Sequence, residues 1–143
     1  GANPMAAARR RRASFASRDE ALGRYARRRP LGVWRADALA AYVDAGFGDA
    51  ADGTVALKCT PEDEARTFEG AGKTTIDDVG TVATPIVIAR GGREGDVGPA
   101  GFAGSVAEAL PAGELRRYPE LSHFGPFEDP HLIATEAVAF LAN

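Results

Sequence analysis

The residues best suited to acid–base chemistry lie in one short segment near the carboxyl end of the chain. His123 stands within residues 122–130 (SHFGPFEDP) and is one of only two histidines in the 143 residues. Histidine is the side chain that exchanges a proton near neutral pH without assistance. Gly125 and Pro126 follow it, and they prevent a helix or strand from extending through the segment. The pattern predicts an imidazole on a loop, where a fixed scaffold can aim it.

A carboxylate that could serve this histidine lies upstream, after a predicted strand. Residues 84–90 (TPIVIAR) form an apolar, β-branched run that is typical of a strand buried on both faces of a parallel sheet. The run ends at two glycines, after which come Glu94 and Asp96. An acid that accepts a hydrogen bond from an imidazole fixes its tautomer, and the imidazole can then take a proton from a nucleophile or from water. A shorter turn after Gly92 would present Glu94 instead of Asp96, so both are candidates for this acid.

The elements that must position these groups follow one another from residue 84 onward. The order is a strand at 84–90, a helix, a strand at 114–118, the histidine loop and a last helix. This order implies a right-handed crossover between two adjacent parallel strands. Loops at the carboxyl ends of parallel strands collect functional residues, and both Asp96 and His123 lie on such loops.

The amino-terminal half has a different pattern. Residues 1–47 are predicted to form three short amphipathic helices with little strand character, the second of which starts at a capping box from Ser17 to Glu20. After them we expect a short strand at 54–59, a helix from 61 to about 68 and a polar loop over 69–80. The chain is therefore predicted to be an α/β protein with two parts, a mainly helical region 1–80 and an α/β region 81–143.

Composition limits the class of protein. Apolar residues make up 45% and charged residues 26%, which is ordinary for a soluble globular domain. No apolar run approaches the length of a membrane span, so we expect no membrane partner. Cys59 is the single cysteine, which excludes a disulfide within the chain and fits a reducing compartment. We therefore expect a cytoplasmic protein.

Positive charge is concentrated at the amino-terminal end. Residues 1–29 carry nine arginines against Asp19 and Glu20, although the whole chain has a net charge of −3. Such asymmetry can indicate an arm that binds a polyanion. No aromatic residues interleave the arginine runs, which favours a solvated helical face over nucleic-acid binding. A non-catalytic helical module that binds an anionic partner through this face is the alternative function.

The histidine loop and the helix after it resemble the corresponding segment of α/β-hydrolases. In that family the nucleophile, the acid and the histidine follow one another along the chain, and Asp96 followed by His123 agrees with this order. Residues 84–143 are similar to the last two strands and helices of the fold. The helical region with Trp34 is similar to the lid. The resemblance implies a partial α/β-hydrolase core with a mainly helical lid, and it favours Asp96 over Glu94 as the acid.

The sequence also departs from the family pattern. It contains no G-x-S-x-G nucleophile elbow, and the oxyanion-hole segment and first strands are missing. The resemblance thus implies the carboxyl-terminal part of a hydrolase about twice this length, with a missing amino-terminal half that supplies the nucleophile.

What the resemblance implies for function is hydrolysis of an ester-like bond in a small-molecule substrate, without a metal or organic cofactor. The nucleophile outside this chain would be a serine or, for epoxide or carbon–halogen substrates, an aspartate. Trp34 and Phe124 are the expected substrate-binding side chains. The isolated chain is expected to be inactive.

Overall fold

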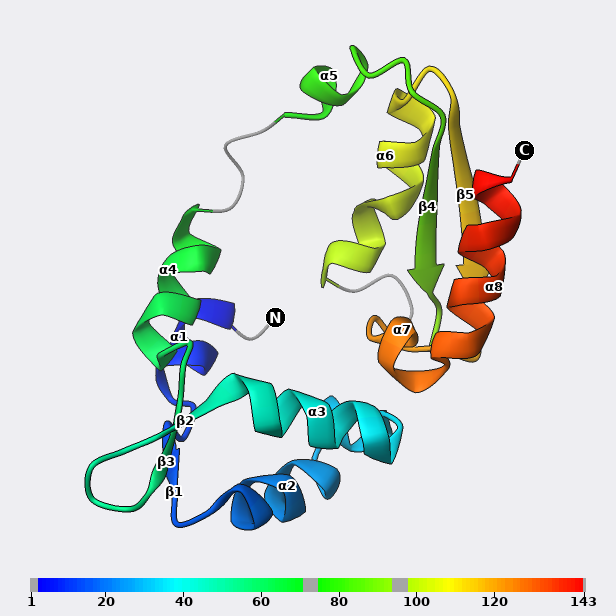
Figure 1. Ribbon diagram of the computed structural model, residues 1–143. Coiled ribbons are helices and arrows are strands. Elements are labelled where there is room, and N and C mark those ends of the chain that lie inside the picture. The colour runs from blue at the N-terminus through cyan, green and yellow to red at the C-terminus, as the bar shows by residue number, and fades with distance from the viewer. Residues whose placement is uncertain (1–2, 71–74, 94–97, 143) are drawn as a thin grey trace. The chain divides into compact units, whose positions relative to one another are not determined.

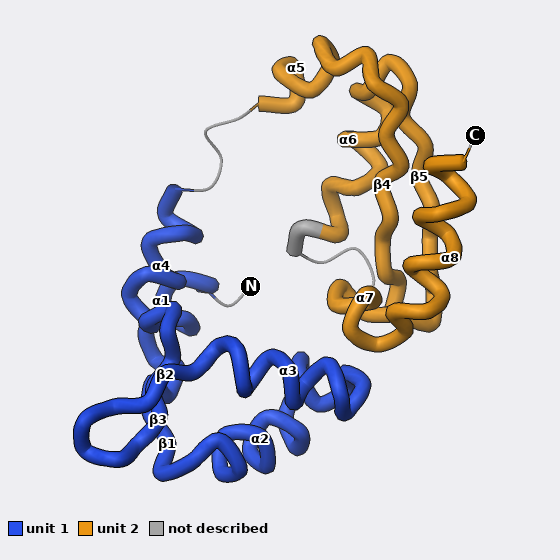
Figure 2. The backbone as a smooth tube through the Cα atoms, in the orientation of Figure 1, with its two compact units in different colours: residues 1–73 blue, residues 74–143 orange. Residues whose placement is uncertain are grey.

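The computed structural model describes residues 3–70, 75–93 and 98–142. It divides into two compact units, residues 1–73 and 74–143 (Figure 2). The boundary lies a few residues before the predicted one at 80/81. The interpretation of the two parts as lid and core stays a prediction. Among the described residues, no helix is both long and apolar enough to cross a membrane.

Unit 1 combines helices with a small antiparallel sheet in which β3 lies between β1 and β2. Strand β1 falls where helix was expected, and β2 begins at the last residue of the expected helical region, 1–47. The first helix of the chain ends at Arg9, and residues 14–15 pair with β3 because this buries Phe15 in the core. Its elements in chain order are α1 (Pro4–Arg9), β1 (Ser14–Phe15), α2 (Arg18–Ala26), η1 (Leu31–Val33), α3 (Ala36–Gly46), β2 (Phe47–Asp49), β3 (Val55–Leu57) and α4 (Pro61–Gly70).

Aromatic side chains form the centre of unit 1. The Phe15 ring packs edge to face against Tyr25 and Phe47, at centroid distances of 5.8 and 5.7 Å. Such pairs add stability beyond the apolar area they bury. The predicted cap of α2 is present, because the Glu20 N–H donates to the Ser17 hydroxyl at 3.1 Å. The Glu20 carboxylate accepts from the N–H of Ala16, one residue earlier than a capping box requires.

Unit 2 contains the strand–helix–strand–helix order that the sequence predicts. Strands β4 and β5 are parallel neighbours, and Ile86 pairs with Gly113 at one end and Gly91 with Tyr118 at the other. Figure 1 shows α6 and α8 flanking these two strands. One short helix, α5, lies inside the predicted loop over 69–80. The elements are α5 (Ile76–Val79), β4 (Ile86–Gly91), η2 (Gly98–Phe102), α6 (Ala103–Ala109), β5 (Gly113–Tyr118), α7 (Gly125–Glu128) and α8 (Pro130–Leu141).

Strand β4 is less buried than its composition predicts. Ile86, Val87 and Ile88 are each half-buried, although the sequence is typical of a strand covered on both faces. Within the described residues β4 pairs with β5 alone. Strand β4, whose sequence is typical of the interior of a sheet, therefore lies at the edge of a two-stranded sheet. Its backbone groups on that side can pair with another strand, and its apolar side chains are partly exposed.

We expect this edge to cause self-association, because unpaired backbone groups on an apolar strand invite another strand to dock. Light scattering after size-exclusion chromatography should show dimers or larger species as the concentration rises. Ala89→Lys places a charge on the exposed part of β4 and should shift the chain toward monomer. Leu141→Lys, at a highly exposed position on α8, is the control and should leave association unchanged. A wild-type chain that stays monomeric throughout would contradict the edge argument.

Candidate active site

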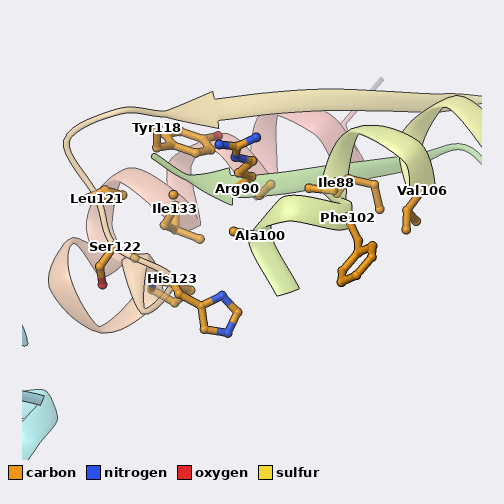
Figure 3. A pocket seen from close by; sticks show the side chains of 15 residues that line it. Ile88, Arg90, Ala100, Phe102, Val106, Tyr118, Leu121, Ser122, His123 and Ile133 are labelled. Atoms are coloured by element: carbon orange, nitrogen blue, oxygen red, sulfur yellow. The ribbon is translucent and has the colours of Figure 1, made fainter. Parts of the chain in front are cut away.

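His123 lies in the loop between β5 and α7, and its side chain is exposed. It lines a pocket of about 320 Å³ at the carboxyl ends of β4 and β5. Its ring packs edge to face against Phe124, with 5.3 Å between centroids. Figure 3 shows the imidazole extending from the open side of the pocket, together with the ring of Phe102. A proton could therefore pass between His123 and a molecule seated in this pocket.

The pocket has apolar walls with a few polar groups. Ile88 from β4, Val106 from α6 and Ile133 from α8 supply the apolar surface, while Arg90, Tyr118 and His123 add polar atoms. This mixture is typical of a small-molecule site, in which apolar contacts give affinity and a few polar groups fix the orientation. The volume suits a small substrate or one part of a larger substrate.

The backbone beside His123 is fixed by a buried carboxylate. The side chain of Glu128 is only 5% exposed, and it accepts hydrogen bonds from both the N–H of Ser122, at 3.0 Å, and the Ser122 hydroxyl. The same hydroxyl accepts from the N–H of Phe124 at 3.0 Å. Ser122 is buried, and its hydroxyl both donates one hydrogen bond and accepts another within the loop. This serine therefore stabilises the loop and is not placed as a nucleophile.

Arg93 connects this network to the loop after β4. Its guanidinium donates to Glu128 at 2.6 Å and also to the backbone carbonyl of Glu120. Its backbone N–H donates to the carbonyl of Leu121 at 3.0 Å. Arg93 directly precedes the segment that carries Glu94 and Asp96. The start of the predicted acid loop is thus tied to the histidine loop through both side-chain and backbone contacts.

The two loops also meet through their main chains at Gly91. A side chain at Gly91 would overlap the carbonyl group of Ser122 and would lie 2.7 Å from the carbonyl oxygen of Leu121. Only a residue without a Cβ allows such an approach. The last residue of β4 therefore sets the spacing between the strand end and the histidine loop.

Replacing Glu128 tests this network. Glu128→Ala should destabilise unit 2 by about 2 kcal/mol, because it leaves the buried Ser122 groups and the half-buried Arg93 without their acceptor. Glu128→Gln keeps an acceptor for Ser122 and should lose less. Glu114→Ala is the control, since Glu114 also pairs with an arginine at 2.6 Å but is 55% exposed. Urea unfolding measures all three. Equal losses for Glu128→Ala and Glu114→Ala would contradict a buried anchor.

The structure brings some of the predicted site residues together. His123 and Phe124 are neighbours at the pocket, whereas Asp96 and its alternative Glu94 lie outside the described residues. Trp34 belongs to unit 1, where its half-buried ring packs against Tyr42 with 5.5 Å between centroids. Roles for these residues in catalysis or substrate binding therefore stay predictions.

Two residues beside the site were missed from the sequence. Glu128 lies five residues after His123 and is followed directly by Asp129, so the sequence offered two adjacent acids as possible anchors of this loop. Phe102 is the last residue of η2, is 69% exposed and lines the pocket. Its position just after the loop that follows β4 was the available signal. Among the described residues, no three His, Cys, Asp or Glu side chains gather in a way that could hold a metal ion.

No protein-family model and no curated protein sequence matches the chain. A solved structure does match: the crystal structure of E-2-(acetamidomethylene)succinate hydrolase aligns with a TM-score of 0.78 at 18% sequence identity. The alignment covers 98% of this chain and 52% of the hydrolase, so the chain spans about half the length of that protein. This chain has a partial α/β-hydrolase fold. The predicted fold class is confirmed.

The position of the histidine loop follows from the order of the elements, which is β4, α6, β5 and α8. The loop follows the second of two parallel strands, and the segment with Asp96 follows the first. The structural neighbour is a hydrolase, and at 18% identity the match shows a common fold alone.

Proposed function

We propose that this chain supplies the histidine and the acid of an α/β-hydrolase that cleaves an ester-like bond in a small molecule. The observation that carries the proposal is the position of His123 at the mouth of an apolar pocket, on the loop after β5 of a partial hydrolase fold. The pocket offers space for the substrate next to a group that can accept a proton.

In the proposed mechanism His123 removes the proton of a nucleophile that lies outside this chain, or of a water molecule. It then returns the proton to the leaving group. Asp96 accepts a hydrogen bond from the other ring nitrogen, which fixes the tautomer and stabilises the imidazolium. Phe124 and Trp34 contact the substrate, and residues 1–80 serve as the lid. With an aspartate nucleophile, the carboxylate would attack an epoxide or carbon–halogen bond without losing a proton, and His123 would instead deprotonate the water that hydrolyses the resulting ester intermediate.

The length of the neighbouring hydrolase supports a nucleophile outside this chain. The chain aligns with only 52% of it, so the rest of such a protein offers room for a nucleophile and for further strands beside β4. The neighbour acts on E-2-(acetamidomethylene)succinate, and an amide bond is accordingly the first alternative to test beside an ester.

Hydrolysis assays test the proposal. The chain alone should not hydrolyse p-nitrophenyl esters, whereas the protein expressed with the coding sequence upstream of Gly1 should hydrolyse an ester or an amide. A fluorophosphonate probe should label the longer protein outside residues 1–143 if the nucleophile is a serine. Rapid ester turnover by the chain alone would contradict an external nucleophile. A longer protein inert to esters, amides, epoxides and haloalkanes would contradict the hydrolase assignment.

The identity of the acid can be tested separately from turnover. If Asp96 accepts a hydrogen bond from His123, Asp96→Asn should change the imidazole tautomer, because an amide can present a donor where the carboxylate presents only acceptors. The ¹⁵N chemical shifts of the His123 ring report this change. Glu94→Gln is the matched control and should leave the shifts as in the wild type. The reverse result would transfer the role to Glu94.

A further inference from the structure

Unit 1 contains a second pocket that the proposed hydrolysis does not use. Its volume is about 230 Å³, and it lies beside the chain that leaves α1 and the carboxyl end of α2. Phe15, Tyr25 and Leu31 supply apolar surface. Every other lining residue is an arginine, namely Arg10, Arg11, Arg12, Arg24, Arg28 and Arg29.

Two of these guanidinium groups are fixed by partners in unit 1. Arg11 pairs with Glu64 at 2.9 Å, and Arg12 pairs with Glu20 at 2.8 Å while lying over the Phe15 ring. These carboxylates hold the two guanidinium groups in place in the pocket wall and offset part of their charge.

Arg10 and Arg28 differ from Arg11 and Arg12 in their partners. Neither forms an ion pair with a carboxylate among the described residues. Arg28 lies two residues past the end of α2, where the negative end of the helix dipole offsets part of its charge. Like charges gathered at one pocket repel one another, and a bound anion would remove that cost.

We propose that this pocket binds a small, multiply charged anion of the phosphate class, such as a pyrophosphate group. One guanidinium group can donate two parallel N–H hydrogen bonds to two oxygens of a phosphate, because its planar geometry matches theirs. A lysine ammonium group does not offer this geometry. The pocket volume suits a phosphate or pyrophosphate group. Phe15 and Tyr25 are both buried, so they cannot serve as platforms for nucleic-acid bases. A compact anion therefore fits this pocket better than a single-stranded nucleic acid.

Titration calorimetry of the chain with pyrophosphate at low salt tests the proposal. Binding should saturate at one anion per chain, and Arg10→Gln combined with Arg28→Gln should weaken it roughly tenfold or more. Arg66→Gln combined with Arg117→Gln is the control, because it removes the same charge from exposed positions outside the pocket. This control should bind as the wild type does. Comparison of pyrophosphate with a nucleoside diphosphate shows whether the phosphates are recognised free or as part of a nucleotide.

Three results would overturn the proposal. The first is wild-type binding that never saturates. The second is an equal loss of affinity in both double variants, which would reflect net charge rather than a site. The third is tight binding of an oligonucleotide that pyrophosphate does not displace, which would indicate an extended nucleic-acid surface. Circular dichroism confirms that the variants are folded. Because the binding assay needs no turnover, its result is independent of the proposed hydrolysis.

Discussion

Replacing His123 with alanine in the complete hydrolase should lower kcat/KM for ester hydrolysis by at least ~10²–10⁴-fold. The imidazole is the group that can accept the proton of the nucleophile at the mouth of the pocket, and among the described residues no second histidine and no carboxylate lines this pocket. Because catalytic groups act as a unit, the loss can exceed the contribution of proton transfer alone.

The other histidine provides a matched control for this experiment. His131 is exposed near the start of α8 and does not line the pocket, so His131→Ala should keep full activity. Binding of substrate should persist in His123→Ala, since the apolar walls remain. Steady-state kinetics and a binding assay separate these effects. Full turnover by His123→Ala would remove the basis for a hydrolase function of this chain.

Gly91→Ala should destabilise unit 2 by about 3 kcal/mol, the upper end of what overpacking costs. The added methyl group would overlap the Ser122 carbonyl group, and a backbone group cannot rotate away as a side chain can. Either β4 or the histidine loop must shift. In the complete enzyme the shift should also lower kcat more than it raises KM, because it displaces the base rather than the pocket walls.

Gly104→Ala is the control for the glycine substitution. Gly104 lies in α6, where an added Cβ has no atom within 4 Å, and alanine favours a helix over glycine by up to about 1 kcal/mol. This variant should be as stable as the wild type or slightly more stable. Urea unfolding measures both variants. A Gly91→Ala protein with wild-type stability would show that the two loops are not in close backbone contact.

Local patterns were sufficient to predict the parts of the fold that depend on neighbouring residues. The β-branched run of β4, the alternation of strands and helices after it and the loop setting of His123 could all be inferred before the structure. Strand β1 could not, because residues 14–15 become a strand only through pairing with Val55 and Ala56 of β3, which lie 40 or more positions later. Long-range pairing of this kind leaves little trace in a short segment.

In the candidate site, too, local features could be predicted from the sequence and long-range contacts could not. The histidine was found from its loop, but its support by Glu128 and Arg93 depends on a contact between segments 35 residues apart. For residues 1–47 the sequence predicted three short amphipathic helices with little strand character. The structure instead places Phe15, Tyr25 and Phe47 in a packed aromatic cluster, because the sheet of unit 1 brings together residues whose spacing is not periodic.

The open edge of β4 has a practical consequence for experiments in trans. Alternate residues of a parallel strand direct their backbone hydrogen-bonding groups to opposite sides, so β4 retains groups that face away from β5. A separate polypeptide that carries the complementary strands of a hydrolase could dock along this side. The chain would then form one piece of a split enzyme, and fusing each piece to a different protein would convert ester hydrolysis into a reporter of the proximity of those proteins.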